Sequence, residues 1–226
     1  MRRVRVIPVL LIDKGKLVKT TKFKNPNYIG DPVNAVKIFN DKEVDEIVLL
    51  DITATKEKRE PDYDKIEEIC SEAFMPFAYG GGIKSLSQVD LLFQLGIEKV
   101  VLNSVLHSNI GLVKEISEKY GAQSIVASID VKKSLFRRHF AYSHSGQHKI
   151  KLTLEKHLEN ILSAGVGEVF LNSIDKDGTF SGFDIELIRD LSKKSEVPIV
   201  ACGGARHLED FKLAINNGAS AVAAGS

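Results

Sequence analysis

The sequence has little cysteine and almost no excess of charge. Its two cysteines, Cys70 and Cys202, exclude a disulfide framework and a multi-cysteine zinc site. The 31 Lys and Arg residues are balanced by 30 Asp and Glu residues. The resulting net charge of +1 argues against a protein that coats a polyanion, so we expect no nucleic acid partner, although local phosphate binding stays open.

Long apolar runs are also missing. No stretch reaches the roughly 18 apolar residues of a membrane span, so we expect no membrane association. The apolar run at residues 6–12 ends at Asp13 without a small-residue cleavage site, which argues against a signal peptide. We therefore expect a cytoplasmic protein. Its 226 residues, 43% of them hydrophobic, can form a sizeable core.

Short apolar runs and helical patterns alternate along the chain. Eight runs are typical of strands buried on both faces of a parallel sheet: residues 4–12, 46–51, 76–79, 99–103, 124–130, 168–172, 198–202 and 220–224. Helical patterns fall between them at residues 31–42, 85–95, 109–120, 153–164, 184–192 and 208–217. This order predicts a closed (β/α)8 TIM barrel in a single domain over residues 1–226, with an open doubly wound sheet as the alternative.

An internal repeat favours the barrel. The run Tyr79-Gly80-Gly81-Gly82-Ile83 recurs as Cys202-Gly203-Gly204-Ala205, and the strand at residues 48–53 recurs at residues 169–175. We expect two homologous half-barrels, at about 1–120 and 121–226. The last expected strand ends at residue 224, so the eighth helix is absent from this sequence, and we expect a truncated product or a further tail.

Small and polar residues follow four of the expected strands. Glycine backbone amides approach an anion closely, and asparagine and serine add donors. A single Gly-Gly pair is more simply a tight turn, but two copies related by the repeat predict two phosphate sites and a substrate with a phosphate at each end. The first site comprises Gly81, Gly82, Asn103 and Ser104, and the second Gly203, Gly204, Gly225 and Ser226.

Carboxylates also follow the expected strands. Asp130 ends an apolar strand and is the strongest candidate for a general acid or base. Asp177 is either a second catalytic carboxylate or a turn aspartate before glycine. For Asp51, a hydrogen bond that anchors the next loop is favoured over catalysis. Lys19 is a candidate catalytic cation on the first loop, with a solvated surface lysine as the alternative.

Four charged residues begin expected strands at the other end of the barrel. Two cations and two anions can form a ring of salt bridges that closes this end, either as a stabilising plug or as a gate for a small molecule. They are Arg5, Glu46, Lys99 and Glu168.

Together these segments resemble the cyclase (synthase) subunit family of imidazole glycerol phosphate synthase, nearly from end to end. The isomerase that precedes it in histidine synthesis shares the repeat but matches less well. The resemblance implies a glutaminase subunit docked at the barrel bottom, ammonia that passes the gate at Arg5, Glu46, Lys99 and Glu168, and a phosphorylated small molecule at the active face. The matching segments include Val6-Ile7-Pro8, Val18-Lys19, Phe23-Lys24-Asn25, Leu50-Asp51-Ile52-Thr53-Ala54, Gly80-Gly81-Gly82-Ile83 and Asp175-Lys176-Asp177-Gly178-Thr179.

One position departs from the family. Its cyclases use two aspartates, at the ends of strands one and five, as acid and base. The second matches Asp130, but the first falls on Leu11, which cannot transfer a proton. Asp13 lies two residues further, about 6–7 Å along an extended strand, and is a poor replacement.

This departure leaves three hypotheses. Leu11 and the segment 18–26 resemble cyclase-like proteins associated with amidination of a sugar in bacterial surface polysaccharides, where a separate amidotransferase completes the reaction. The chain is then an ammonia-delivering subunit. It is alternatively a histidine-pathway cyclase that tolerates Leu11, or a non-catalytic activator of a glutaminase.

The sequence gives no reason to expect a metal or a cofactor. His144 and His148 are four residues apart, but on a hairpin this spacing presents no common metal-binding face. Cys202 has no evident histidine partner and is better explained as a small buried residue than as a nucleophile.

Overall fold

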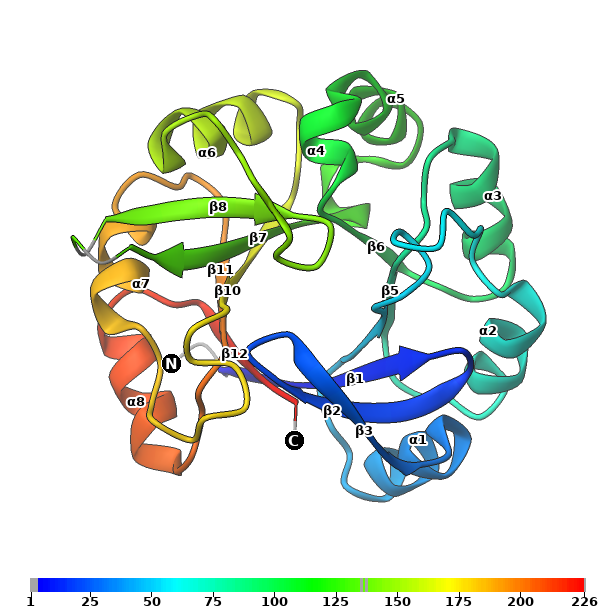
Figure 1. The fold of residues 1–226 in the computed structure, drawn as a ribbon. Helices are drawn as coiled ribbons and strands as arrows, with labels where there is room; N and C mark the ends of the chain where they lie inside the picture. The colour runs from blue at the N-terminus through cyan, green and yellow to red at the C-terminus, as the bar shows by residue number, and fades with distance from the viewer. Residues whose placement is uncertain (1–3, 135, 137, 226) are drawn as a thin grey trace.

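Eight parallel strands close a barrel in the computed structural model, which describes residues 4–134, 136 and 138–225 (Figure 1). The last strand returns to the first, with Arg5 opposite Ala221, so the barrel has no free edge. The predicted (β/α)8 barrel is confirmed, and the open-sheet alternative is wrong. The barrel strands are β1 (Arg5–Asp13), β4 (Ile47–Asp51), β5 (Phe77–Gly80), β6 (Lys99–Leu102), β7 (Ile125–Lys133), β10 (Glu168–Ser173), β11 (Ile199–Cys202) and β12 (Ala221–Ala224).

Helices surround this ring, and α4 and α5 both follow β6. The sequence patterns predicted α1, α3 and α5 to α8 but neither the short α4 nor α2, half of whose residues are charged and in which only Ile66 and Ile69 are buried. After β12 the described chain continues only to Gly225. The helices are α1 (Pro32–Asp41), α2 (Tyr63–Cys70), α3 (Leu86–Gln94), α4 (Val105–Ser108), α5 (Ile110–Tyr120), α6 (Leu154–Ser163), α7 (Ile185–Ser192) and α8 (Leu208–Asn216), with the 3-10 turn η1 at Ala122–Ser124.

The core has two layers, because barrel side chains alternate between the helices and the barrel interior. The outer layer joins strands to helices through large buried residues such as Phe77 and Tyr79. The inner layer fills the barrel with small and branched side chains: Ile7, Val9, Val48, Ala78, Val101, Val126, Phe170, Val200, Ala221 and Ala223. The interior is therefore packed and apolar over most of its height.

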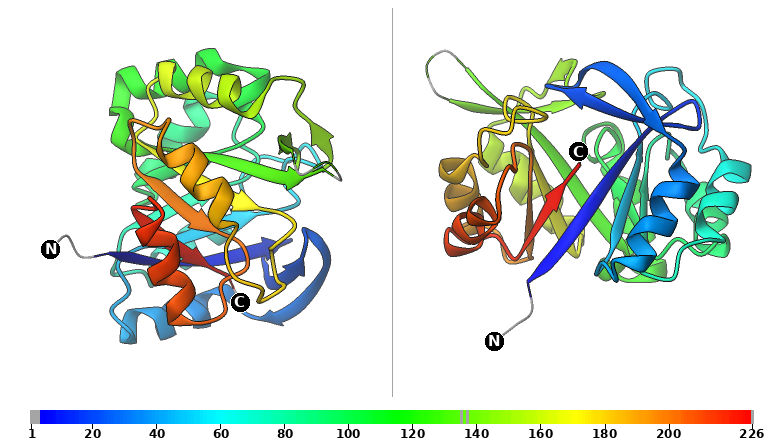
Figure 2. Two further views of the ribbon diagram at one scale, coloured as in Figure 1. Left: turned by 90° about the vertical axis from the view of Figure 1, so that its left-hand side faces the viewer. Right: turned by 90° about the horizontal axis from the view of Figure 1, so that it is seen from below.

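Two antiparallel hairpins extend β1 and β7 beyond the barrel. The first is formed by β2 (Lys16–Thr21) and β3 (Lys24–Gly30), and the second by β8 (His139–Ser143) and β9 (His148–Lys149). Figure 2 shows both hairpins at the end of the barrel opposite the start of β1. The first strand of each half is therefore followed by a hairpin over the same face.

The register of the strands repeats between the halves. Leu50 pairs with Gly80 as Asn172 pairs with Cys202. The helices that follow also match, because α2 and α7 have eight residues each and α3 and α8 have nine. Residues 50–103 therefore correspond to residues 172–225 without a gap.

Candidate functional site

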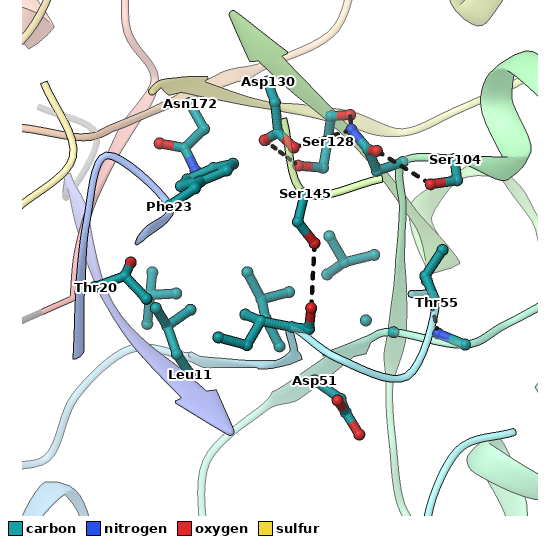
Figure 3. Close-up of a pocket in the computed structure, with 18 of the residues that line it drawn as sticks. Leu11, Thr20, Phe23, Asp51, Thr55, Ser104, Ser128, Asp130, Ser145 and Asn172 are labelled. Atoms are coloured by element: carbon teal, nitrogen blue, oxygen red, sulfur yellow. Dashed lines mark hydrogen bonds between the residues drawn. The ribbon is translucent and has the colours of Figure 1, made fainter. Parts of the chain in front are cut away.

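A cavity of about 890 Å³ opens where the barrel strands end (Figure 3). Its floor consists of barrel residues, and its walls come from the two hairpins and the loops after β4, β5 and β6. The carboxyl ends of the strands form the active face in barrels of this type. Of the sequence candidates, Leu11, Lys19, Asp130 and Asp177 all line this cavity.

Asp130 lies in a polar corner of the cavity and is almost fully buried. Its carboxylate accepts hydrogen bonds from the side-chain amide of Asn103 at 3.3 Å and from the hydroxyl of Ser128 at 3.5 Å. Burial first, and then the nearby charge of Asp177, raise the pKa of Asp130 to about 7. A carboxyl group with such a pKa both accepts and donates a proton near neutral pH, as a general acid or base requires.

Leu11 occupies the place that corresponds to Asp130 in the other half. Leu11 pairs with Leu50 on β4 and Val18 on β2, whereas Asp130 pairs with Asn172 on β10 and Tyr142 on β8. The cavity is therefore apolar at Leu11 and polar at Asp130, which lie on opposite sides of it in Figure 3.

Asp13 does not replace the missing carboxylate. Its side chain accepts a hydrogen bond from the hydroxyl of Thr53 at 3.1 Å and is not among the described residues that line the cavity. The sequence argument against this residue agrees with its position.

Asn172 is a site residue that the sequence analysis did not identify. It is 7% exposed, lines the cavity beside Asp130, and has a side-chain oxygen for which the described residues provide no hydrogen-bond partner. The internal repeat contained a signal for this residue, because a polar Asn172 in the second half takes the place of the apolar Leu50 in the first half. Cys202, the next strand end, is partly buried, and desolvation raises the pKa of its thiol, which keeps it protonated and a poor nucleophile.

Asp177 holds the first hairpin rather than pointing freely into the cavity. Its carboxylate accepts hydrogen bonds from the hydroxyl of Thr20 at 3.0 Å and the backbone amide of Phe23 at 3.2 Å, while its carbonyl accepts from Lys22 at 3.0 Å. Burial nevertheless raises the pKa of Asp177. Lys19 lies on β2 of this hairpin, exposed at the cavity rim.

Asp51 anchors the loop after β4, as predicted. Its carboxylate accepts hydrogen bonds from the backbone amides of Thr53 at 3.0 Å and Ala54 at 2.9 Å, and Arg59 lies 3.4 Å away. In Figure 3 it is turned away from the centre of the cavity.

The residues of the two expected phosphate sites line two adjoining cavities. Gly81, Gly82, Asn103 and Ser104 line the large cavity, Gly203 and Gly204 line a smaller one of about 170 Å³, and Gly225 lines both. Ser226 was assigned to the second site but lies outside the described residues.

These glycines allow close approach of neighbouring loops. A Cβ on Gly81 would lie 2.6 Å from the carbonyl oxygen of Asp51, and a Cβ on Gly203 would lie 2.6 Å from that of Ser173. Both glycines also adopt positive φ angles, of 128° and 93°. The same structural requirement therefore applies in both halves, independently of any ligand.

Arg5, Glu46, Lys99 and Glu168 meet at the bottom of the barrel and are called the floor ring below. Glu46 binds Arg5 and Lys99 at 2.8 Å each, and Glu168 binds Arg5 and lies 3.7 Å from Lys99. Both carboxylates are buried, at 3% and 7% exposure. The predicted ring of salt bridges is therefore formed, and the inner apolar layer lies above it.

No group of three metal-binding side chains occurs among the described residues. The rings of His144 and His148 do meet, with centroids 4.7 Å apart, because the second hairpin brings them together. Within the same part of the chain, no helix is both long and apolar enough to cross a bilayer.

Comparison with known proteins identifies the family. The model of a family described as "Histidine biosynthesis protein" matches residues 5–226. A Pseudomonas aeruginosa protein named "Putative imidazole glycerol phosphate synthase subunit hisF2" is 47% identical over all of this chain and 90% of its own length. A Vibrio vulnificus protein named "Putative imidazole glycerol phosphate synthase subunit hisF3" is 44% identical over all of this chain and 88% of its own length. The "Imidazole glycerol phosphate synthase subunit HisF" of Streptomyces griseus is 37% identical over 99% and 89%.

The closed barrel and the family match over residues 5–226 define a (β/α)8 protein of the histidine-biosynthesis type. Within that class, the chain belongs to the cyclase subunit family of imidazole glycerol phosphate synthase.

Proposed function

We propose that this chain receives ammonia from a glutaminase partner at the floor ring and delivers it through the barrel for amidination of a surface-polysaccharide sugar. The observation that carries the proposal is Leu11 in the place that corresponds to Asp130. The cyclase reaction needs a proton acceptor and a proton donor, and the first half supplies neither at this position. The floor ring and the apolar interior above it are retained, which supports a role in passing a small neutral molecule.

The relatives support a specialised member of the family. The identities of 47% and 44% to the proteins named hisF2 and hisF3 are higher than the 37% to the Streptomyces griseus protein named HisF. In this role a separate sugar amidotransferase carries out the final step, and Asp130 is no longer one of a catalytic pair. A glutaminase that binds the floor end supplies the ammonia.

A cyclase of histidine synthesis is the second candidate. It is favoured by the raised pKa of Asp130 and by the two expected phosphate sites. The deciding experiment supplies the histidine-pathway bisphosphate and excess ammonium, which makes the glutaminase unnecessary. We expect no imidazole glycerol phosphate from the natural sequence. Turnover that Asp130→Asn abolishes would overturn the proposal and establish the cyclase.

A second measurement separates delivery from simple activation of a glutaminase. In this experiment a glutaminase subunit is bound and labelled glutamine is supplied. Ammonia that crosses the barrel is then trapped by a reagent confined to the active face, such as an acceptor held in the cavity. We expect Lys99→Met to alter this transfer while glutamate release continues. Glutamate release without any transfer in the natural protein would leave only the activator role.

A further inference from the structure

The two expected phosphate sites correspond residue by residue, because residues 50–103 match residues 172–225 without a gap. The large cavity is lined on this side by residues 55, 56, 58 and 80–84. The small cavity is lined by residues 177, 178, 180 and 202–206, which are the counterparts in the same order. The backbone therefore follows the same course at the two sites, which differ only in their side chains.

The side chains give the sites different charges. Lys56, Lys58 and Lys84 line the first site. The corresponding residues at the second site are Gly178, Phe180 and Arg206. The ammonium of Lys84 donates to the carbonyl oxygen of Lys58 at 3.1 Å, which brings the loops after β4 and β5 together. Three lysines thus surround one site, and one arginine stands at the other.

Nearby carboxylates do not cancel this charge. Asp51 is engaged by backbone amides and by Arg59. Glu57, in the same loop, pairs with Arg59 at 2.7 Å and Lys14 at 3.1 Å. Among the described residues, neither Asp51 nor Glu57 forms an ion pair with the three lysines of the first site, so these lysines keep their charge beside the cavity.

We infer that the first site binds a diphosphate group, whereas the second binds a single phosphate beside the exposed ring of Phe180. A phosphomonoester carries about −1.5 to −2 charges at pH 7, which one cation and a few amides balance. A second phosphate adds charge that the three lysines match. Phe180 is 54% exposed, so an apolar or ring-shaped part of the ligand packs there. The ligand is thus an organic compound with a diphosphate at one end and a single phosphate at the other, an inference that rests on the proposed function because it assigns a ligand to the same active face.

Calorimetry in magnesium-free buffer tests this with two matched pairs of probes, inorganic pyrophosphate against phosphate and ADP against AMP. We expect the diphosphate of each pair to bind at least tenfold more tightly. Binding by pyrophosphate alone would identify a site for the free anion, which overturns an organic ligand. Amide resonances locate the site, and pyrophosphate should shift Gly81 and Gly82 before Gly203 and Gly204.

Variants supply the controls. Lys56→Gln with Lys84→Gln should lower pyrophosphate affinity to the level of phosphate and flatten its dependence on salt. Lys114→Gln removes an exposed lysine on α5 that does not line the cavity and should change nothing. Equal affinity for both members of each pair, or shifts confined to Gly203 and Gly204, would overturn the inference. Because binding needs neither glutaminase nor ammonia, such a failure leaves the proposed ammonia delivery standing, and a failure of delivery leaves the diphosphate site standing.

Discussion

Leu11 and Asp130 occupy corresponding positions, each near the end of the first strand of its half and each paired with the hairpin that follows. Leu11 pairs with Val18 and Asp130 with Tyr142. The backbone therefore presents two equivalent places for an acid and a base, and the chain keeps a carboxyl group in only one. The consequences of that asymmetry can be measured without knowing the substrate.

The stability of the protein should depend on the charge of Asp130. Its pKa is raised to about 7 from an ordinary value near 3.8, so the folded protein binds a proton that the unfolded chain releases between these pH values. Stability from this group is present below about pH 4 and is lost as the pH rises to 7, with a slope of about 1.4 kcal/mol for each pH step of one between the two pKa values.

Asp130→Asn, which stays neutral, tests this. The unfolding free energy of this variant should rise relative to that of the natural protein between pH 4 and pH 7. Above pH 7 the difference between the two proteins should stay constant. Urea denaturation at four pH values gives the comparison. A difference that is constant with pH would show that Asp130 is already ionised in the folded protein.

The floor ring should contribute to stability because its carboxylates are buried and bind two cations. Glu46→Gln leaves Arg5 and Lys99 facing each other with a weaker acceptor, and we expect a loss of about 2 kcal/mol in unfolding free energy. The matched control is Glu57→Gln, an exposed carboxylate with two cationic partners, which should leave the unfolding midpoint unchanged. Equal effects of the two substitutions would contradict a special role for burial.

Asp177 should hold the first hairpin over the cavity. Asp177→Ala removes the acceptor for the Thr20 hydroxyl and the Phe23 amide, each worth about 1 kcal/mol. Hydrogen exchange at residues 20–25 should then become about tenfold faster or more. Thr20→Val removes only one of the two bonds and should have a smaller effect. Unchanged exchange in Asp177→Ala would mean that other contacts hold the hairpin.

Substitution of the paired glycines should be equally harmful in both halves. Gly81→Ala and Gly203→Ala each place a Cβ 2.6 Å from a carbonyl oxygen, and we expect each to cost about 2 kcal/mol or more. Gly96→Ala is the control, because Gly96 also has a positive φ, of 96°, but no atom within 4 Å. Its cost should be limited to backbone strain, about 1 kcal/mol. A Gly96 variant as unstable as the other two would show that φ alone matters.

The sequence predicted most of the fold because its signals were local. Short apolar runs bounded by glycines located the barrel strands, and Asp31 and Ser85 mark helix starts at which their side chains cap the helix. The floor ring was also predictable, because Arg5, Lys99 and Glu168 each begin a strand, Glu46 directly precedes one, and parallel strands in a barrel begin at one end.

The rest depended on contacts between distant segments. Nothing near Asp177 indicates that it binds Phe23, 154 residues earlier in the chain. The first hairpin was missed because β3 is exposed over most of its length and carries no alternating apolar pattern. The difference in charge between the two proposed phosphate sites emerged only when the strand register fixed which residues correspond.

The floor ring bears on how the two halves depend on each other. Its carboxylates, Glu46 and Glu168, are counterparts in the repeat, but both cations, Arg5 and Lys99, come from the first half, and Ala221 takes the place of Lys99 in the second. A barrel assembled from two copies of the second half would bury two acidic groups with no counter-ion from these positions. The two halves are therefore not interchangeable, because the first half carries the cations that pair with the buried carboxylates of both.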